Sequence, residues 1–514
     1  MNTTISPDGI PRMALTVNGQ FPGPQITANW GDTIVVHVKN SFQNNGSTLH
    51  WHGIRQNYTN EMDGVASITQ CPIAPGDSMT YTFRASNYGY SWYHAHISIQ
   101  AYMGVQGPMV INGPKSIPGS PEEEIIVLND WTHVPVDQMY DAAQEAGPRP
   151  EHGPRTMDTG LINGMNIWGG NDGAPGVTGK RWSTSVQPGH QKLFRILNSA
   201  IQSTYIFSLD GHSMQVVAND FVPIVPYTAN SVAINPGQRY DVLITFNQKA
   251  GNYWFRADNQ NECAETTAWN NIKGIVSYST VQKGVPTSAA WTYTPGCRDE
   301  ALSSLVPAYA LDAGVTHANP LVETVTIGAN SQNLFKWSLN SVTFQSEWDH
   351  PTLPSIVHNG TIPPYSGPLA ISVPKLGEWV YIIVQSPIPF PHPIHLHGHD
   401  FYVLAQGTGL YDSDIPLNLK NPARRDTAMM PWQPTGANAT GGYLVIAYYA
   451  DNPGAWLMHC HIGWHNAMGF ALQIIEAQDL IPGTVADVPL MDKVCRNYNS
   501  YATEFDVVTP DSGV

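Results

Sequence analysis

The sequence predicts an all-β protein that consists of three related β-sandwiches. Glycine (45 residues) and proline (41 residues) are abundant among the 514 residues, and charged residues make up only 12%. This composition favours short strands separated by turns over long helices. Apolar stretches bounded by turn residues recur along the chain, as in β-sandwich proteins. One strand pattern also returns three times, which indicates three units of the same construction.

The strand patterns fall into three blocks along the chain. Those of the first block cover residues 33–40, 79–84 and 107–114, and those of the second cover residues 124–130, 239–246 and 252–257. Short helices are expected at residues 136–144 and around the last histidine-rich strand. A stretch from about residue 280 to residue 320 is rich in Ala, Thr, Ser and Pro, which is typical of a linker. We therefore predict domains at residues 1–115, 116–300 and 301–514.

The repeated pattern is a strand with aromatic residues near its start. Residues 91–96 read Ser-Trp-Tyr-His-Ala-His, residues 251–257 read Gly-Asn-Tyr-Trp-Phe-Arg-Ala, and residues 455–461 read Ala-Trp-Leu-Met-His-Cys-His. The middle copy lacks histidine. Three related sandwiches, with metal ligands in the first and third only, would explain this pattern.

Charge and hydropathy exclude several classes of protein. The formal net charge of −16 makes nucleic acids and anionic membranes poor partners. No apolar run reaches the roughly 20 residues that span a bilayer. The first residues do not resemble a signal peptide, which does not by itself place the chain in the cytosol. Five Asn-X-Ser/Thr sequons are compatible with secretion and glycosylation: Asn2, Asn45, Asn57, Asn359 and Asn438.

Ten histidines and one cysteine stand at closely ordered spacings in four motifs. They are His50 and His52; His94 and His96; His392, His395 and His397; and His459, Cys460, His461 and His465. Imidazole together with thiolate is the ligand mixture that suits copper. The motifs therefore predict copper redox chemistry.

Strand geometry divides these residues into two metal centres. Because neighbouring residues of a strand point to opposite faces, His459 and His461 share one face and Cys460 points to the other. Cys460 needs imidazole partners, and His392 and His465 are the spare ones. Two histidines and a cysteine are the blue-copper set. The eight remaining histidines can hold three more copper ions with open positions for oxygen.

Two other interpretations of the motifs compete with copper. One His-X-His pair can be a packing feature, but four such pairs, one of which encloses a cysteine, are hard to explain in this way. Structural zinc favours closed four-ligand sites rich in cysteine, which eleven ligands with one thiolate do not match. His399 continues the alternation of His395 and His397, and we expect it to be a supporting residue.

The other four cysteines are Cys71, Cys263, Cys297 and Cys495. They can form two disulfides in three possible pairings. The simplest pairing joins Cys263 to Cys297, the nearest pair in the sequence, and leaves Cys71 for Cys495. The sequence alone does not decide between the pairings. An even number fits an oxidising compartment.

The four motifs and the three blocks resemble those of the multicopper oxidases. Within that family the whole chain is most similar to fungal laccases of the ascomycete type. The resemblance implies three cupredoxin-like Greek-key β-sandwich domains. It also implies a type 1 copper bound by His392, Cys460 and His465, and a type 2 copper bound by His50 and His395. The implied ligands of the type 3 pair are His52, His94, His96, His397, His459 and His461.

The resemblance assigns further roles outside the ligand set. Asp63 lies in a segment similar to the laccase stretch that holds a carboxylate near the trinuclear site, where it would help to deliver protons; a solvated loop Asp is the alternative. The cysteines match the two laccase disulfides, Cys71 with Cys495 and Cys263 with Cys297. Residues 511–514 resemble the C-terminal plug of that subgroup.

The resemblance also implies a substrate side. His465 would receive the electron with Trp464 beside it, and Phe335 and Trp337 would line the pocket, although ordinary strand-core aromatics are the alternative for the last two. Asp220 resembles the acid that takes the phenolic proton, with a turn Asp as the alternative.

Phe470 stands ten residues after Cys460, at the axial position of the type 1 copper. Its side chain cannot donate to copper. Without a thioether ligand the oxidised ion is less stabilised, so the resemblance predicts a high reduction potential.

The implied function is that of a laccase, in which one-electron oxidation of phenols and aromatic amines is coupled to four-electron reduction of O2 to water by four copper ions. Bilirubin oxidase, ferroxidase and ascorbate oxidase are alternatives within the family. A ferroxidase needs carboxylates beside the type 1 histidine, for which we find at most Asp220 and Glu262. A copper-binding protein without turnover is the alternative from another class. We expect a secreted, extracellular monomer whose partners are O2 and small aromatic reductants.

Overall fold

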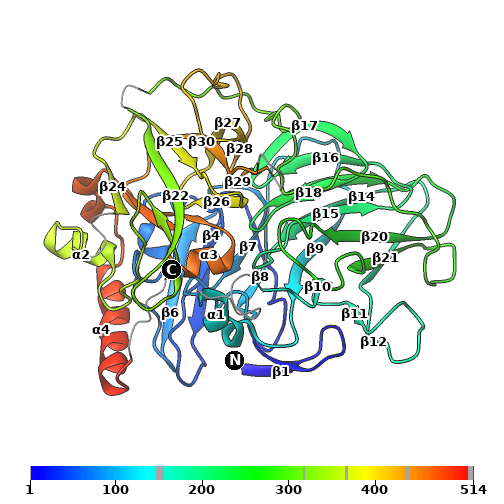
Figure 1. Cartoon of the computed structure of the whole chain (residues 1–514), viewed down its shortest axis with the longest axis horizontal. Coiled ribbons are helices and arrows are strands. Elements are labelled where there is room, and N and C mark those ends of the chain that lie inside the picture. The colour runs from blue at the N-terminus through cyan, green and yellow to red at the C-terminus, as the bar shows by residue number, and fades with distance from the viewer. Residues whose placement is uncertain (1, 146–154, 317–318, 365–368, 434–438, 508–512) are drawn as a thin grey trace.

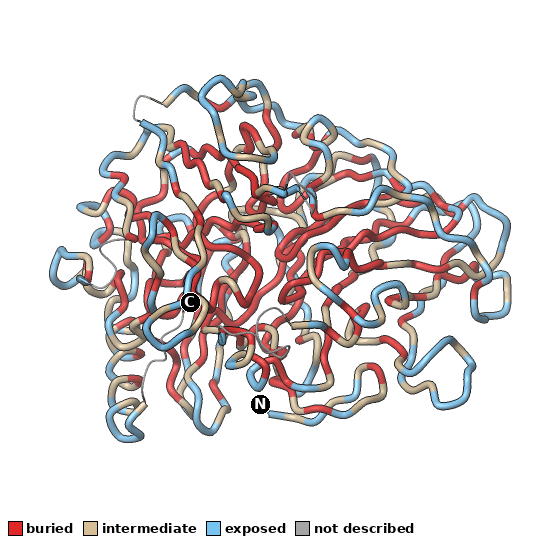
Figure 2. The backbone as a smooth tube through the Cα atoms, viewed as in Figure 1, coloured by how far each residue is buried: buried red, intermediate tan, exposed pale blue. Residues whose placement is uncertain are grey.

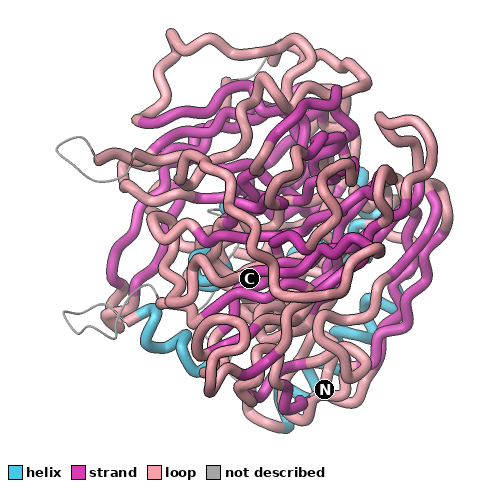
Figure 3. The backbone as a smooth tube through the Cα atoms, turned by 90° about the vertical axis from the view of Figure 1, so that its right-hand side faces the viewer, coloured by secondary structure: helices cyan, strands magenta, loops and turns pink. Residues whose placement is uncertain are grey.

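The computed structural model describes residues 2–145, 155–316, 319–364, 369–433, 439–507 and 513–514. Asn438 and residues 511–512 of the proposed plug lie outside these ranges. Strands run through the body of the molecule and few helical segments lie between them (Figure 3), which confirms the predicted all-β class. The strands form groups within residues 2–112, 122–278 and 321–476, here called the first, second and third blocks; their colours run from blue through green to orange (Figure 1).

One type of sheet is built in the same way in all three blocks. In the first block its order is β3 (Ile26–Asn29), β8 (Gln106–Asn112), β7 (Gly89–His94) and β5 (His50–Trp51). In the second it is β13 (Ser183–Val186), β21 (Lys273–Tyr278), β20 (Asn252–Asn259), β15 (Tyr205–Leu209) and β18 (Val232–Ile234). In the third it is β24 (Ala370–Val373), β32 (Ala471–Glu476), β31 (Gly454–Cys460), β26 (His392–Leu396) and β29 (Thr427–Met430).

This common order explains the repeated sequence pattern. In each sheet the first strand runs parallel to its neighbour, and that neighbour pairs antiparallel with the repeated strand, which is β7, β20 or β31. The repeated strand therefore occupies the same position three times. Only β7 and β31 place histidines there, so two of the three equivalent positions can bind metal.

A second sheet accompanies each repeated sheet. In the first block it consists of β4 (Thr33–Lys39) and β6 (Ser78–Arg84). In the second its order is β10 (Thr159–Ile162), β9 (Glu122–Trp131), β14 (Gln191–Asn198), β19 (Arg239–Thr245), β16 (Met214–Asn219) and β17 (Val222–Ala229). In the third it is β23 (Phe335–Leu339), β22 (Leu321–Ala329), β25 (Trp379–Gln385), β30 (Gly442–Tyr449), β27 (Phe401–Thr408) and β28 (Arg424–Arg425). Two small hairpins, β1 (Asn2–Ile5) with β2 (Arg12–Leu15) and β11 (Ile167–Trp168) with β12 (Thr178–Gly179), complete the described strands.

Side-chain alternation explains why these segments are strands. In β4 the apolar Ile34 and Val36 lie opposite Phe83 and Tyr81 of β6, while the intervening side chains are exposed. A strand that faces water on one side shows this period of two. β31 instead is buried along its whole length because it lies inside a five-stranded sheet. The buried backbone runs through the interior of all three blocks (Figure 2).

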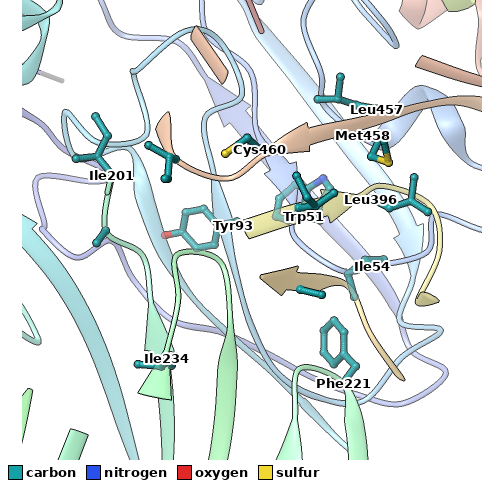
Figure 4. Packing of buried hydrophobic residues seen from close by; sticks show 14 of the residues in the cluster. Trp51, Ile54, Tyr93, Ile201, Phe221, Ile234, Leu396, Leu457, Met458 and Cys460 are labelled. Atoms are coloured by element: carbon teal, nitrogen blue, oxygen red, sulfur yellow. The ribbon is translucent and has the colours of Figure 1, made fainter. Parts of the chain in front are cut away.

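The blocks meet in one apolar core. Residues of all three blocks belong to it, and Figure 4 shows among them Trp51 and Tyr93 of the first block, Phe221 and Ile234 of the second, and Leu457, Met458 and Cys460 of the third. Burial of such side chains contributes on the order of 25 cal/mol per Å² of apolar surface. The core therefore fixes the positions of the histidine-bearing strands relative to one another.

Helices are few and lie between or beyond the strands. α1 (Val136–Gln144) covers the predicted residues 136–144, and α3 (Gly463–Ala467) follows the last histidine-rich strand as expected. α2 (Thr352–Asn359) and α4 (Val488–Glu504) were not predicted from the sequence. Two 3₁₀ turns, η1 (Asn60–Met62) and η3 (Gln478–Gly483), are the other helical elements with described bounds. No strand or helix of the described residues lies between β21 and β22, as predicted for a linker. The described helices include none long and apolar enough to cross a membrane.

Both disulfides of the simplest pairing are present. Cys71 is bonded to Cys495 in α4, and Cys263 is bonded to Cys297. The first bond joins residues 424 positions apart and so closes most of the chain into one loop, whereas the second spans 34 positions.

The long loop makes the first disulfide the more important for stability. Removing it with Cys71→Ala and Cys495→Ala should lower the free energy of unfolding by about 2 kcal/mol more than Cys263→Ala with Cys297→Ala, because the entropy of the unfolded chain grows with loop length. Urea unfolding of the two double variants measures the difference. A larger loss for the Cys263 and Cys297 variant would show that loop entropy does not set the order.

Candidate metal centres

Strand pairing brings the histidines of distant motifs together. In the first block His50 of β5 lies directly opposite His94 of β7. In the third block His395 of β26 lies opposite His459 of β31. Because facing residues of an antiparallel pair lie about 5 Å apart, each pairing places two imidazoles side by side.

Eight histidines from the two blocks form one buried cluster. The ring of His50 stacks on that of His397, and the ring of His52 stacks on that of His395, in both cases with 3.9 Å between centroids. The other members are His94, His96, His459 and His461, whose rings lie among the first four. All eight are buried. The first and third blocks therefore each supply half of a single site.

Hydrogen bonds to backbone carbonyls fix which ring nitrogen is available. In each bond the Nδ1 atom of a histidine donates to the carbonyl of another residue: His50 to Asp63 (2.8 Å), His395 to Asp426 (2.7 Å), His94 to Ala95 (3.1 Å) and His459 to Cys460 (2.9 Å). When one nitrogen donates in this way, the other carries the lone pair. In the described part of the chain the Nε2 atoms of His50, His94 and His395 have no hydrogen-bond partner.

Burial also sets the protonation state of the cluster. Removal from water, reinforced by the neighbouring imidazoles, holds the pKa of His94, His96, His395, His397 and His461 well below the usual value. Burial lowers the pKa of His459 to about 4. These six rings are therefore neutral near pH 7, which is the form that binds metal.

The donor set fits metal ions. Ligand atoms lie within 4.8 Å of one another in three histidine triads: His50 with His52 and His94; His50 with His395 and His397; and His96 with His397 and His459. Buried polar atoms are nearly always satisfied in proteins. Several unpartnered imidazole nitrogens that converge in the interior are explained by bound cations.

A second centre lies on the other side of β31. The Sγ atom of Cys460 is 3.6 Å from Nδ1 of His392 and 3.6 Å from Nδ1 of His465, and these two nitrogens are 3.1 Å apart. The short helix α3 turns His465 back toward Cys460. Burial raises the pKa of the Cys460 thiol, so a metal must displace its proton. Two imidazoles and a thiolate are the blue-copper donors.

One strand connects the two centres. Cys460 contacts His392 and His465, while its covalent neighbours His459 and His461 belong to the eight-histidine cluster. The predicted arrangement of two centres on opposite faces of this strand is therefore what the structure has. Figure 4 shows Cys460 at the end of β31, the strand that also carries Leu457 and Met458.

Comparison with known proteins supports the same chemistry. Multicopper oxidase family models match residues 1–116, 122–280 and 321–479. The chain belongs to the multicopper oxidases. It is 42% identical to Laccase-1 of Botryotinia fuckeliana, over 100% of this chain and 88% of that protein.

Solved structures agree with this assignment. The crystal structure of the laccase from Botrytis aclada superimposes with a TM-score of 0.92 at 39% identity, over 100% of this chain and 93% of that one. Fet3p, a multicopper oxidase that functions in iron import, shares the fold with a TM-score of 0.80 at 24% identity, over 100% and 95% of the two chains. The protein is thus a laccase-type multicopper oxidase with a cupredoxin-like fold.

Asp63 is buried between two histidines of the oxidase's cluster. Its Oδ2 atom accepts a hydrogen bond from Nδ1 of His397 at 2.8 Å, and its Oδ1 atom lies 3.1 Å from Nδ1 of His50. Its side chain is 0% exposed, so the alternative of a solvated loop residue is wrong. The carboxylate thus orients His397 of the third block, while the backbone carbonyl of Asp63 accepts from His50 of the first.

Two of the aromatic residues predicted for the substrate side differ in their surroundings. Trp337 lies 4.4 Å from the ring of His465, and its backbone N–H donates to the carbonyl of Met468, which holds β23 against the end of α3. Phe335 lies two residues earlier on the same strand and is half-buried. Phe390, which was not predicted from the sequence, is 41% exposed, and its ring lies 6.3 Å from that of Trp337.

Trp464 is buried against the second block. Its Nε1 atom donates to Oε1 of Gln202 at 2.7 Å, and its ring is parallel to that of Tyr140. Tyr140 in turn donates to the carbonyl of Ala467. These contacts fix α3, and with it His465, but they direct the indole N–H away from solvent. Neither Gln202 nor Tyr140 carries a local sequence signal.

The expectation that Asp220 is the substrate acid is wrong. Its carboxylate accepts hydrogen bonds from Nε of Arg425 (3.1 Å) and from the backbone N–H groups of Asp426 (3.2 Å) and Arg239 (3.0 Å). The two guanidinium groups hold the pKa of this buried carboxyl below its usual value, against the effect of burial. Asp220 has a φ of 48° at the turn between β16 and β17, so the turn alternative describes it.

Phe470, His399 and the C-terminal end also lie among the described residues. Phe470 is buried, with its ring 5.0 Å from that of His392. His399 lies outside the cluster and is 3.2 Å from Glu476, as expected for a supporting residue. At the C-terminal end, the carbonyl of Val514 accepts a hydrogen bond from Asn466 in α3. The described part of the proposed plug therefore contacts the helix that carries His465.

The position of Asp63 predicts a specific effect of its removal. Asp63→Asn keeps the size of the side chain but replaces the carboxylate that accepts from His397 and lies beside His50 with a neutral amide, so turnover or metal affinity of the cluster should fall roughly 10- to 100-fold. Copper analysis and oxygen uptake measure this.

Asp8→Asn is the matched control, because Asp8 is also buried and accepts from a histidine, His133, at 2.7 Å outside the cluster. Equal losses in the two variants would mean that Asp63 acts only through stability.

Proposed function

We propose that this oxidase removes single electrons from small phenols and aromatic amines at the Cys460 centre and uses dioxygen as the final acceptor at the eight-histidine cluster. One observation carries the proposal. Cys460 contacts His392 and His465, while peptide bonds join it to two members of the cluster. A through-bond path of two residues thus connects the two ligand sets.

The donor chemistry supports four copper ions. His392, Cys460 and His465 would hold the type 1 ion, and His50 and His395 the type 2 ion. The ligands of the type 3 pair would be His52, His94, His96, His397, His459 and His461. When bound, copper would supply the one-electron chemistry and the affinity for dioxygen. Division of the chain into domains at 1–115, 116–300 and 301–514 is part of the proposal and is supported by the repeated sheets.

His465 is the most accessible ligand. It has intermediate exposure, whereas His392 and Cys460 are buried. The ring of Trp337 beside it and the exposed ring of Phe390 offer aromatic faces. Such faces suit flat aromatic reductants. We therefore place substrate contact at the His465 edge, with Trp337 as a wall and Phe335 and Trp464 as more distant supports.

The surroundings of His465 do not favour a ferroxidase. Binding of Fe(II) requires carboxylates near the accepting ligand, but Asp220 is occupied by arginines and Glu262 is an exposed residue with no contact to His465 among the described residues. Bilirubin and ascorbate oxidation are distinguished by experiment below. A protein without turnover is disfavoured because all eleven ligands are present.

Secretion is supported by three features. Four sequons, Asn2, Asn45, Asn57 and Asn359, lie on exposed residues. Two disulfides fit an oxidising compartment. Relatives are fungal laccases. The monomeric state stays a prediction.

A substrate panel tests the proposal. Oxygen uptake by the copper-loaded protein should be fastest, at equal concentrations, with a methoxyphenol, and slower with bilirubin, ascorbate and Fe(II). A wide advantage for bilirubin or Fe(II) would refute the phenol assignment. A copper-loaded protein without the blue band of a copper–thiolate bond would refute the type 1 assignment.

Phe470 predicts the effect of an added axial donor. Phe470→Met places a thioether near His392, which stabilises the oxidised ion and should lower the type 1 reduction potential. Redox titration of the blue band measures it. Phe470→Leu is the control, because it removes the ring without adding a donor. Equal potentials in the Met and Leu variants would contradict an axial role for this position.

A further inference from the structure

The second block lacks metal-binding histidines but reaches the eight-histidine cluster with one loop. Between β18 and β19 the chain turns at Gly237, which has a φ of +85°. A Cβ atom on Gly237 would lie 2.7 Å from Cδ2 of His461 and 3.0 Å from its Nε2. The backbone of this loop therefore packs directly against one ligand ring, at a distance that only glycine allows.

Arg239 follows two residues later and is fully buried. Its Nη1 and Nη2 atoms donate to Oδ1 and Oδ2 of Asp426, each at 2.6 Å. Nη1 also donates to the carbonyl of Gly237, and Nε donates to the carbonyl of Tyr90, both at 3.1 Å. One guanidinium group thus connects Tyr90 of the first block, Gly237 of the second and Asp426 of the third.

Asp426 connects this guanidinium to ligands of both blocks. Its Oδ1 atom lies 3.1 Å from Nε2 of His52, and its backbone carbonyl accepts from Nδ1 of His395 at 2.7 Å. Thr427 completes the arrangement, because its Oγ1 lies 3.1 Å from Asp426 Oδ1 and 3.1 Å from His395 Nδ1. A displacement of Asp426 would therefore turn two imidazoles at once.

A second ion pair, between Asp220 and Arg425, packs against the pair of Arg239 and Asp426. Asp220 accepts from the backbone N–H groups of Arg239 and Asp426, and its side chain pairs with Arg425. Arg425 also lies 3.5 Å from Asp299. The buried carboxylates and guanidinium groups alternate, which compensates the cost of removing each charge from water. The orientation of Asp426 is thereby fixed by Arg239 and Thr427 at its side chain and by Asp220 at its backbone N–H.

We propose that Arg239 is a positioning residue of the dioxygen site, through which the histidine-free second block orients His52 and His395, and that Gly237 seats His461. The bidentate pair is rigid because a planar guanidinium matches a carboxylate in two bonds at once. The proposal rests on the copper assignment above. It gives the second block an indirect part in the chemistry of oxygen, through the orientation of the ligands.

Arg195 supplies a matched control in the same block. It lies on β14, next to β19, and is also buried. Its guanidinium pairs with two carboxylates, Glu123 and Asp241. Among the described residues, the hydrogen bonds of its side chain go to these two carboxylates and to no histidine of the cluster. Arg195→Gln therefore removes a buried, doubly paired arginine without touching Asp426.

The test compares Arg239→Gln, Arg239→Lys and Arg195→Gln in the copper-loaded protein. We measure copper per chain, the paramagnetic resonance signal of type 2 copper, and the blue band. Arg239→Gln should release type 2 copper to a chelator at roughly 10- to 100-fold lower chelator concentration than wild type and alter its resonance signal. The blue band should stay, because Cys460 faces the other way. Arg239→Lys, which keeps the charge but loses the second bond, should show a smaller change of the same kind.

Arg195→Gln should unfold at a lower temperature than wild type and retain both spectra. The proposal is overturned if the Arg239 variants keep the type 2 signal and copper affinity of wild type, or if Arg195→Gln changes the signal equally. If Arg239→Gln does not fold, Arg239→Lys alone decides between these outcomes. Absence of a type 2 signal in wild type would refute the copper assignment itself, which is a distinct result.

Discussion

The alternation of side chains along β31 is the constraint on which the rest of the molecule depends. A strand turns successive residues to opposite faces, so Cys460 reaches His392 and His465 while His459 and His461 reach the cluster. β31 must therefore be covered on both faces, since each face carries a metal centre. The sheets of the third block cover one face, and the first block covers the other. A helix could not separate adjacent residues in this way.

Features of the fold and of the sites that depend on local residue spacing could be predicted from the sequence. The two-residue period of a strand predicts the faces to which His459, Cys460 and His461 point. The repeated strand could be recognised because its aromatic residues recur. Asp220 shows where such reasoning ends. The local sequence of Asp220 resembles the segment that holds the substrate acid in the family. In the structure, however, Asp220 is surrounded by Arg239 of the second block and Arg425 of the third. The pairing of Asp220 with Arg425, 205 positions later, leaves no local pattern in the sequence. Gln202 and Phe390 escaped prediction for the same reason. α4 was missed because its buried stripe of Met491, Val494 and Tyr498 is narrow.

Two carboxylates of the described residues contact the cluster, Asp63 at His397 and Asp426 at His52. Burial favours the neutral form of the imidazoles of His395 and His397. Further charges lie one layer outward, where Arg239 and Arg425 alternate with carboxylates. An isolated carboxylate beside the histidines would be costly to bury. The arginines remove this cost for Asp426, and this is a physical reason for a second block that has no ligand of its own.

Burial of the one unpaired cysteine has a further consequence for assembly. Four cysteines form disulfides, and Cys460 must not join them. The thiolate is the form that attacks disulfides, and the folded chain raises the pKa of this thiol by removing it from water. Before metal enters, Cys460 is thus a protonated and inert thiol. Metal binding must then release that proton, while the neutral imidazoles release none. The protein therefore combines a thiol that is safe in an oxidising compartment with a centre whose metal affinity rises with pH.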